Sequence, residues 1–343
     1  MERSETYLAV LAELKRRSGQ TVSGNELAAS LGISRTAVWK HIRTLRSRGY
    51  LIESHPKKGY RLTALSHSLA PEEVLPLLQT RLLGRTYDYH EVLASTNDRA
   101  LDLARAGACH GTTVVAEEQT AGRGRLRRPW VSPKGLGLYV SVILRPDVPP
   151  RRGPETTLIA ALALARSLRT QWGVDACLKW PNDVLISGKK VAGILTEMQT
   201  DPDRIQFLVV GVGVNVLHEA KDFPDDVLYP ATSLALEWAK LATDKPQDAA
   251  KPSRAQVLAA FLNTLEGDYE AYLREGLRRF QEDLRKMSVV LGKAIRIQVS
   301  DRILEGVARD LTDRGGLIVE TRHGALETVW VGDILHLREA DPG

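Results

Sequence analysis

Residues Asn25–Ile42 (NELAASLGISRTAVWKHI) predict a helix, a tight turn and a second helix. Gly32 suits the left-handed conformation that ends a helix, and Ser34 is placed to cap the helix that follows. Apolar residues recur at helical spacing on both sides of the turn, as expected for two helices that share a core. These residues are Leu27, Ala28 and Leu31 in the first helix and Ala37, Val38 and Ile42 in the second.

The flanking sequence extends this motif to a winged helix-turn-helix. Tyr7–Arg17 has the pattern of an amphipathic helix, and Tyr50–Leu62 predicts two short strands around a lysine-containing tip. The alternative is an ordinary small helical bundle with a charged surface. Turn glycine, helix cap, apolar spacing and local charge all favour the winged fold. The residues expected to contact DNA are Ser34, Arg35, Thr36, Trp39, Lys40, Arg43, Lys57 and Lys58.

The basic charge of the chain is concentrated in its first residues. The 343 residues carry a formal net charge of +5. Residues 1–65 hold 12 Lys and Arg against 5 Asp and Glu, whereas the remainder holds 35 against 37. This asymmetry predicts a DNA-binding module attached to a nearly neutral body. It also disfavours a nucleic-acid-modifying enzyme as the function of the body.

The composition is typical of a soluble globular protein, with 43% hydrophobic and 26% charged residues. Two cysteines, Cys109 and Cys177, give neither a disulfide framework nor metal-ligand spacing. The N-terminus is polar, and no apolar run approaches the length that spans a membrane. We therefore expect a cytoplasmic protein without a membrane partner.

From about Tyr87 the pattern changes to apolar strands that alternate with helices, which is typical of an α/β or α+β domain. The expected strands are Thr112–Glu117, Leu138–Leu144 and Leu208–Val216, and the expected helices are Asp98–Ala106 and Glu155–Trp172. Residues Gly211–Asn215 (GVGVN) lack the third glycine of a dinucleotide-binding turn. They are better explained as a buried strand whose glycines let another group lie close.

One loop of this domain predicts an anionic ligand. Gly122–Trp130 (GRGRLRRPW) places four arginines and two glycines within seven residues and ends on a tryptophan. Arginines require acidic partners, and glycines let the backbone approach a ligand closely. The indole offers a face on which a purine can stack. A solvated basic loop is the simpler explanation of such a cluster, so the interpretation depends on the other motifs.

Three further segments contain chemically useful side chains. Ser95-Thr96-Asn97 stands just before a helix, where a simple capping role is the ordinary explanation. Lys179–Asp183 (KWPND) groups a cation, an amide and a carboxylate around a proline. Lys190 directly precedes the strand-like Val191–Leu195, although a lone lysine at a strand start is usually solvated. A phosphate-binding P-loop is absent from the sequence.

Taken in order, Ser95-Thr96-Asn97, Gln119 with GRGRLRRPW, KWPND and KVAGIL resemble the family of bifunctional biotin–protein ligases and biotin operon repressors. The resemblance covers nearly the whole chain. One departure is Arg127, which stands where the family pattern often has glycine. The resemblance implies ATP and Mg²⁺ as cofactors, biotin as substrate, and biotinyl-5′-AMP as intermediate and corepressor.

The resemblance also implies roles for individual residues. Lys190 and Arg123 would be the catalytic cations, and Asp183 would help to hold Mg²⁺. The biotin site would contain Ser95, Thr96, Asn97, Gln119, Arg123, Lys190 and Gly193. The ATP site would contain Arg125, Arg128, Trp130, Lys179, Asn182, Asp183 and Asn215.

The expected fold is a multidomain α+β protein. It would have a winged helix-turn-helix over residues 1–65, a linker and short helix over 66–84, and a ligase domain over 85–286. By resemblance the ligase domain is of the class II synthetase-like type, and residues 287–343 form a small SH3-like β-barrel. The alternating runs Ala294–Val299, Gly316–Glu320 and Asp333–Arg338 favour an antiparallel barrel directly.

The implied partners are the lysine of a biotin carboxyl carrier protein, double-stranded operator DNA, and a second copy of the chain in a homodimer. Two alternatives remain open from the sequence. One is a transcription factor that senses a metabolite without catalysis, which Lys190 and KWPND disfavour because a sensor needs no phosphate-directed cations. The other is a ligase of the same fold for lipoate or another acyl acid.

Overall fold

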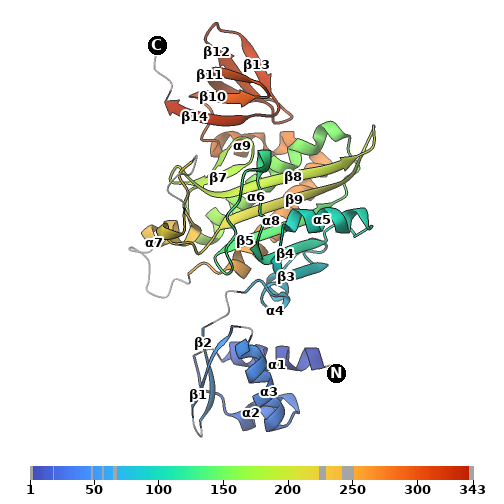
Figure 1. The fold of residues 1–343 in the computed structure, drawn as a ribbon, viewed down its shortest axis with the longest axis vertical. Coiled ribbons are helices and arrows are strands. Elements are labelled where there is room, and N and C mark those ends of the chain that lie inside the picture. The colour runs from blue at the N-terminus through green and yellow to red at the C-terminus, as the bar shows by residue number, and fades with distance from the viewer. Residues whose placement is uncertain are drawn as a thin grey trace. The chain divides into compact units, whose positions relative to one another are not determined.

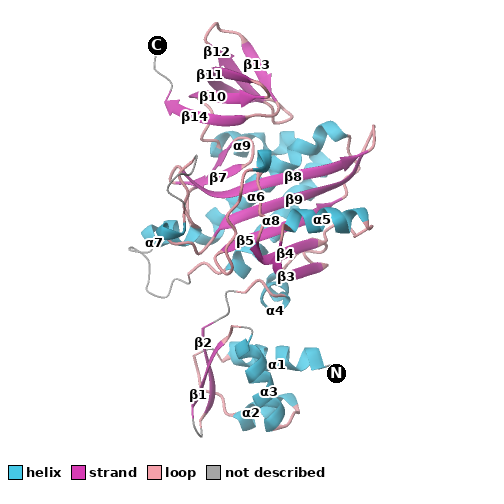
Figure 2. Ribbon diagram, in the orientation of Figure 1, coloured by secondary structure: helices cyan, strands magenta, loops and turns pink. Residues whose placement is uncertain are grey.

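The computed structural model divides the chain into two compact units, residues 1–73 and 74–343. It describes residues 3–17, 19–47, 49–55, 58–64, 68–223, 229–241 and 251–339. Figure 1 gives the order of the elements, and Figure 2 gives their types. In the part of the chain that is described, no helix is long and apolar enough to cross a membrane.

The N-terminal unit is the expected winged helix-turn-helix. Gly32 ends the first motif helix with φ of 64°, and Ser34 Oγ accepts a hydrogen bond of 3.1 Å from Ala37 N at the start of the next helix. The elements of this unit are α1 (Arg3–Arg16), α2 (Gly24–Leu31), α3 (Arg35–Ser47), β1 (Leu51–His55) and β2 (Gly59–Ala64). Helix α1 begins four residues earlier than the sequence pattern predicts.

The wing is fixed to the helical part of this unit by backbone pairing. Val22 and Tyr60 exchange two backbone hydrogen bonds of 2.8 Å. A Cβ at Gly59 would lie 2.0 Å from Val22 O, so this position requires glycine. The core consists of Val10, Leu11, Leu14, Val22, Leu27, Val38, Ile42, Leu45, Tyr50, Ile52 and Leu62. Ala28, Leu31 and Ala37 of the predicted apolar faces are only partly buried.

A seven-stranded sheet organises the second unit, in the order β3-β4-β5-β9-β8-β7-β6. Only β3 and β4 pair in parallel, so the domain is of the α+β rather than the parallel α/β type. The strands are β3 (Tyr87–Leu93), β4 (Thr113–Gln119), β5 (Gly137–Leu144), β6 (Ala176–Lys179), β7 (Asp183–Ile186), β8 (Lys189–Thr200) and β9 (Ile205–Asn215). The helices are α4 (Pro71–Val74), which spans the boundary between the units, α5 (Thr96–Arg105), α6 (Gly153–Trp172), α7 (Leu234–Leu241), α8 (Arg254–Glu275) and α9 (Gln281–Met287).

The two faces of this sheet differ in chemistry because side chains alternate along each strand. Register pairs Gly193 with Gly213, and Gly213 with Tyr139, so these residues share one face. We call this the glycine face; it also contains Asp183, which pairs with Gly193. The same alternation puts Glu197 on this face. Helix α5 packs against the part of the glycine face that β4, β5 and β9 form (Figure 1).

The opposite face, which we call the packed face, is covered by α6 and α8. Thr157 of α6 donates a hydrogen bond of 2.8 Å to Thr196 of β8, which fixes the face on which α6 lies. The β9 residues of this face are fully or almost fully buried valines and a leucine, namely Leu208, Val210, Val212 and Val214. This face therefore supplies much of the hydrophobic core of the unit. A second apolar cluster packs between α5 and the glycine face, and it contains Ala100, Ala104, Val114, Ile143, Phe207 and Val209.

The C-terminal residues form a five-stranded antiparallel sheet in the order β13-β12-β11-β10-β14. Its strands are β10 (Lys293–Val299), β11 (Arg302–Leu311), β12 (Leu317–Thr321), β13 (Leu326–Val329) and β14 (Asp333–Glu339). The sequence pattern predicted three of these five strands. Gly306 lies inside β11, where a Cβ would sit 2.2 Å from Glu320 O. Close strand approach, not a turn, explains that glycine.

Candidate functional site

The first turn of α5 and the sheet below it form a polar cluster on the glycine face. Ser95 caps the helix, and Thr96 and Asn97 lie within its first turn rather than before it. Gln119 Oε1 accepts hydrogen bonds from Thr96 N at 2.8 Å and Thr96 Oγ1 at 3.1 Å. Ser141 Oγ of β5 lies 2.8 Å from Thr96 Oγ1 and 2.6 Å from Asn97 Oδ1, and its single proton can serve one of these oxygens at a time. Capping is thus only part of what these three residues do.

Gly211 makes room for this cluster. A Cβ at Gly211 would lie 2.0 Å from Asn97 Oδ1, so any side chain there would displace the amide. Asn97 Nδ2 donates to Glu197 Oε2 at 2.8 Å and to Leu195 O at 3.3 Å. The close approach expected from the GVGVN strand is therefore confirmed, with Asn97 as one of the groups that lies against it.

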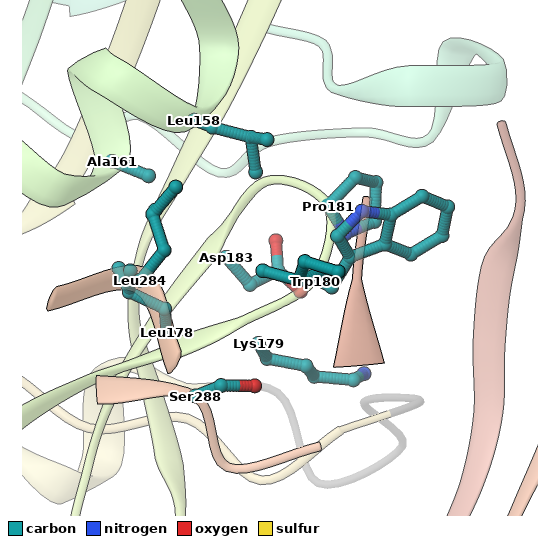
Figure 3. Close-up of a pocket in the computed structure, with 10 residues that line it drawn as sticks. Leu158, Ala161, Leu178, Lys179, Trp180, Pro181, Asp183, Leu284 and Ser288 are labelled. Atoms are coloured by element: carbon teal, nitrogen blue, oxygen red, sulfur yellow. The ribbon is translucent and has the colours of Figure 1, made fainter. Parts of the chain in front are cut away.

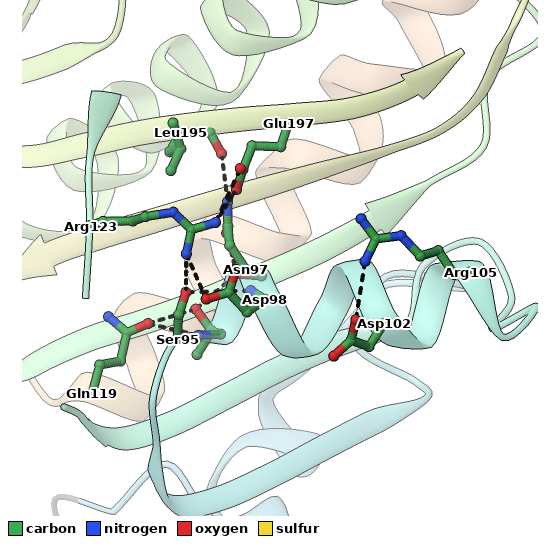
Figure 4. Close-up of polar contacts among 11 residues, drawn as sticks. Ser95, Asn97, Asp98, Asp102, Arg105, Gln119, Arg123, Leu195 and Glu197 are labelled. Carbon is green, nitrogen blue, oxygen red and sulfur yellow. Dashed lines mark hydrogen bonds and ion pairs between the residues drawn. The ribbon is translucent and has the colours of Figure 1, made fainter. Parts of the chain in front are cut away.

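Arg123 of the arginine-rich loop enters the same cluster (Figure 4). Its guanidinium lies 2.7 Å from Asp98 Oδ2 and 3.1 Å from both carboxylate oxygens of Glu197. It also donates to Ser95 Oγ at 3.3 Å. The carboxylates of Asp98 and then Glu197 raise the pKa of Arg123 above its ordinary value. The structure thus brings Arg123 to the polar cluster and neutralises it there.

Trp130, at the other end of the loop, lies flat against the two paired glycines. A Cβ at Gly213 would lie 2.6 Å from Cε2 and Nε1 of the indole, and one at Gly193 would lie 3.3 Å from Cζ3. The indole Nε1 is buried, with no hydrogen-bond partner among the described residues. The face of the sheet is glycine here because an aromatic ring needs the space.

Lys190 is the cation beside this indole. Its Nζ lies 5.4 Å from the Trp130 ring centroid and 2.6 Å from Asp183 Oδ1. The Lys190 side chain is 26% exposed, so it lies at the edge of the site rather than in bulk water. Arg123 and Lys190, the two cations expected to be catalytic, therefore lie on the same face of the sheet.

Lys179 is a second cation near Asp183, and it is more deeply buried. Its ammonium lies 3.8 Å from the ring centroid of Tyr229, which is a cation–π contact. Burial lowers the pKa of Lys179, and the negative charge of Asp183 opposes that shift. Burial, and then the charge of Asp183, raise the pKa of Tyr229. Tyr229 carried no recognisable signal in the sequence.

The middle of the arginine-rich loop contacts the C-terminal sheet. Arg125 Nη1 lies 3.1 Å from Asp333 Oδ1 and Gly332 O, and 3.2 Å from Asn182 Oδ1. Arg128 Nη1 lies 3.0 Å from Asp333 Oδ2. Arg127 has φ of 54°, a left-handed conformation that glycine adopts without strain. The family pattern often has glycine at this position, and the backbone conformation of Arg127 is one that favours glycine.

The remaining predicted site residues lie at the edge of the glycine face. Asn182 Nδ2 donates to Ile194 O at 2.9 Å, which ties the KWPND turn to β8. The Trp180–Pro181 peptide bond in that turn is cis. Asn215 is buried and donates through Nδ2 to Thr232 O at 3.1 Å.

A small cavity lies behind the KWPND turn (Figure 3). Its volume is about 20 Å³, which is enough for a single water molecule and too small for either proposed substrate. The labelled Lys179, Trp180, Pro181 and Asp183 line one side, and Leu158 and Ala161 of α6 line the other. We therefore place the candidate site on the glycine face and not in this cavity.

The candidate DNA-binding residues form an exposed surface on the N-terminal unit. Arg35, Thr36, Trp39, Lys40 and Arg43 all project from α3 into solvent. The Arg43 guanidinium lies 5.9 Å from the Trp39 ring centroid. Ser34 caps α3, and Lys58 of the wing is exposed. Lys57 lies outside the described residues.

Several residues of the site were not predicted from the sequence. They are Asp98 and Glu197 beside Arg123, Ser132 and Ser141 beside the Gln119 cluster, Tyr229 over Lys179, and Asp333 between two arginines. Glu197 had a usable signal, because it follows Gly193 at an even spacing on one strand. Among the described residues, no group of three or more His, Cys, Asp or Glu could hold a metal ion by itself.

Comparison with known families agrees with this organisation. Residues 89–215 match the Biotin/lipoate A/B protein ligase family. Residues 7–61 match an HTH domain, and residues 290–337 match the biotin protein ligase C-terminal domain.

The same organisation is found in individual relatives. The chain is 38% identical over 325 residues to the bifunctional ligase/repressor BirA of Bacillus subtilis, covering 94% of this chain and 97% of that protein. It is 29% identical to the bifunctional ligase/repressor BirA of Escherichia coli, over 94% and 95% of the two chains. The structure of the Aquifex aeolicus biotin protein ligase in complex with biotin and ATP superposes with a TM-score of 0.61 and 26% identity, over 75% of this chain and all of that one. This chain therefore belongs to the family of bifunctional biotin ligase/repressors.

Proposed function

We propose that this protein joins biotin to a lysine of a biotin carboxyl carrier protein at the expense of ATP. In the first step a biotin carboxylate oxygen attacks the α-phosphorus of ATP, which forms biotinyl-5′-AMP and releases pyrophosphate. In the second step the lysine amine attacks the acyl carbon, forms the amide, loses a proton and releases AMP. Both nucleophiles belong to substrates, so the chain must supply positioning and positive charge.

The observation that carries this proposal is the convergence of motifs from distant parts of the chain on one face of one sheet. Ser95, Arg123, Trp130 and Lys190 all lie there. The polar cluster of Thr96, Asn97 and Gln119 would present amides and hydroxyls to the ureido ring of biotin, and Gly193 would leave room for the rest of the ligand.

Charge supports the direction in which the ligand would lie. The polar cluster at α5 lies at one end, and Lys190, Lys179 and Asp183 lie at the other. Lys190 would stabilise the biotin carboxylate and the bridging oxygen of the adenylate. Lys179, Arg125, Arg128, Asn182 and Asn215 would hold the nucleotide, on which Trp130 would stack.

A magnesium ion fits the donor set at Asp183. Asp183 Oδ1 is buried and close to Lys190 Nζ, but it makes no aligned hydrogen bond with the described residues. Mg²⁺ commonly takes one or two carboxylates together with substrate phosphates, so the Asp183 carboxylate alone is sufficient as the protein ligand. When bound, the ion would neutralise phosphate charge during adenylation. Asp183 would hold it against the triphosphate.

The N-terminal unit would bind operator DNA and repress transcription when the ligase site holds biotinyl-5′-AMP. We propose that the adenylate orders the arginine-rich loop and thereby favours a homodimer, which places two winged domains on two half-sites. An adenylate that leaves the monomer–dimer equilibrium and the operator affinity unchanged would contradict this coupling. The five C-terminal strands would form an SH3-like barrel, and the ligase domain would be of the class II synthetase-like type.

The test of the ligase proposal is a streptavidin blot. A biotin carboxyl carrier protein is incubated with the purified chain, biotin, ATP and Mg²⁺, and omission of ATP is the control. We expect ATP-dependent labelling of the carrier. ATP–pyrophosphate exchange driven by biotin but not by lipoate would exclude a lipoate ligase. An unlabelled carrier together with no exchange would leave only the metabolite-sensing repressor.

A further inference from the structure

Glu237 of α7 is a buried carboxylate outside the residues proposed to touch the ligand. It is 3% exposed. It accepts hydrogen bonds from Thr232 Oγ1 at 2.6 Å, Lys240 Nζ at 2.7 Å and Ser187 Oγ at 3.0 Å. Burial alone would raise the pKa of Glu237, but these three donors outweigh it and hold the pKa below its ordinary value. The side chain is therefore a buried anion with a full set of partners.

Two of these partners belong to the segments next to Lys190, one along the chain and one paired with it. Ser187 belongs to the turn that joins β7 to β8, and it has φ of 51°. Thr232 belongs to the segment that pairs with the start of β8. In that pairing Lys190 N donates to Pro230 O at 2.7 Å, and Thr232 N donates to Lys190 O at 2.9 Å. Glu237 thus holds the turn before Lys190 and the segment beside it.

The segment Tyr229–Thr232 reaches two more residues of the site. Its first residue, Tyr229, covers the ammonium of Lys179 at 3.8 Å. Its last residue, Thr232, accepts the Asn215 amide through its carbonyl oxygen at 3.1 Å. Lys179, Lys190 and Asn215 therefore all contact one short segment, and Glu237 bonds to the side chain at the end of it.

We propose that Glu237 is a positioning residue for adenylation, which acts by fixing the backbone of Lys190 through Thr232 and Ser187. This inference rests on the proposed function. Misplacing a reacting group by about 1 Å can cost on the order of 10²-fold in rate, even when the substitution is far from the chemistry. A buried carboxylate that bonds both to the turn before Lys190 and to the segment paired with it is suited to prevent such a shift.

The experiment measures single-turnover formation of biotinyl-5′-AMP by the full chain at saturating biotin and ATP. The burst amplitude counts active sites, and the rate constant reports each site. We expect Glu237→Ala to lower the rate constant by about 10- to 100-fold. Glu237→Gln and Thr232→Val should give smaller losses, because each keeps the shape and removes part of the hydrogen bonding. These two variants carry the test if Glu237→Ala does not fold.

Lys240→Met is the matched control. It removes the partner of Glu237 that belongs to neither the turn before Lys190 nor the segment beside it, and it leaves the bonds to Thr232 and Ser187 in place. We expect its rate constant to stay within about twofold of the unsubstituted chain. A purely structural role for Glu237 would lower the burst amplitude and the melting temperature of the Glu237 variants but leave their rate constants unchanged.

The outcomes separate this inference from the proposed function. Unchanged rate constants in the Glu237 and Thr232 variants, together with a slow Lys190→Ala variant, would overturn the positioning role alone. An unchanged rate constant in Lys190→Ala would overturn the assignment of Lys190 and, with it, the role of Glu237. A slow Glu237→Ala, an intermediate Glu237→Gln and a normal Lys240→Met would establish the inference.

Discussion

Where the seven-stranded sheet underlies the candidate site, its two faces are built from the same strands and have opposite compositions. On β9, Gly211 and Gly213 face Asn97 and Trp130, whereas the intervening Val212 packs in the core. On β8, Gly193 lies beneath the indole, and its neighbour Ile194 is buried. Alternate residues of one strand therefore serve ligand chemistry and stability separately. Substitutions one residue apart should have separable effects.

The largest effect is expected from Lys190→Ala on the glycine face. Loss of one preorganised electrostatic contact typically costs roughly 10²–10³ in rate, so adenylation should slow by about that factor. The side chain is partly exposed and carries no core packing, so the melting temperature should stay the same. Biotin-dependent pyrophosphate release measures the rate. Normal release would remove Lys190 from catalysis.

The second-largest effect is expected from Arg123→Ala. This substitution should weaken retention of the adenylate more than it weakens ATP binding. Hydrogen bonds to charged groups contribute about 1.5–3 kcal/mol, and partial exposure of this side chain favours the lower end. We expect biotinyl-5′-AMP to dissociate roughly tenfold faster, measured by release of labelled adenylate. Equal weakening of ATP binding would show that Arg123 does not distinguish the two ligands.

Gly213→Ala tests whether the glycine face needs its open space. The added methyl would lie 2.6 Å from the Trp130 indole, and overpacking of this kind costs about 1–3 kcal/mol. We expect weaker ATP binding, because the indole must leave the sheet, and an altered tryptophan emission spectrum. Gly267→Ala on α8 is the control, since its methyl meets no atom within 4 Å. Unchanged ATP binding in Gly213→Ala would show that the ring position is unimportant.

Ile194→Val should have the smallest effect, and only on stability. Removing one buried methylene of this kind costs about 0.5–1.5 kcal/mol. The melting temperature should fall slightly, while the adenylation rate per active site stays constant. A changed rate constant would show that the packed face also controls the chemistry. It would contradict the assignment of ligand chemistry to one face and stability to the other.

Local features of the fold were predictable from the sequence, and long-range contacts were not. Gly32 and Ser34 signalled a turn and a cap because both act on backbone within four residues of themselves. The GVGVN glycines signalled a close approach because a strand residue without a side chain leaves space above it, although the approaching groups, Asn97 and Trp130, could not be named.

Partners that join distant segments were missed for a physical reason. Asp333 pairs with both Arg125 and Arg128, but a single aspartate after a glycine has no local pattern. Glu237 resembles any helix-surface glutamate until the fold buries it against Ser187 and Thr232. The strand β11 was missed because its internal Gly306 resembles a turn residue and in fact accommodates the neighbouring strand.

The contact between the arginine-rich loop and the C-terminal sheet has a consequence for biosynthesis. Arg125 and its acceptor Gly332 are separated by 207 residues. A ribosome completes the loop long before it makes Asp333, so Arg125 and Arg128 lack this partner throughout translation of the ligase domain. The loop can reach its final arrangement only when β14 has been synthesised and has paired with β10.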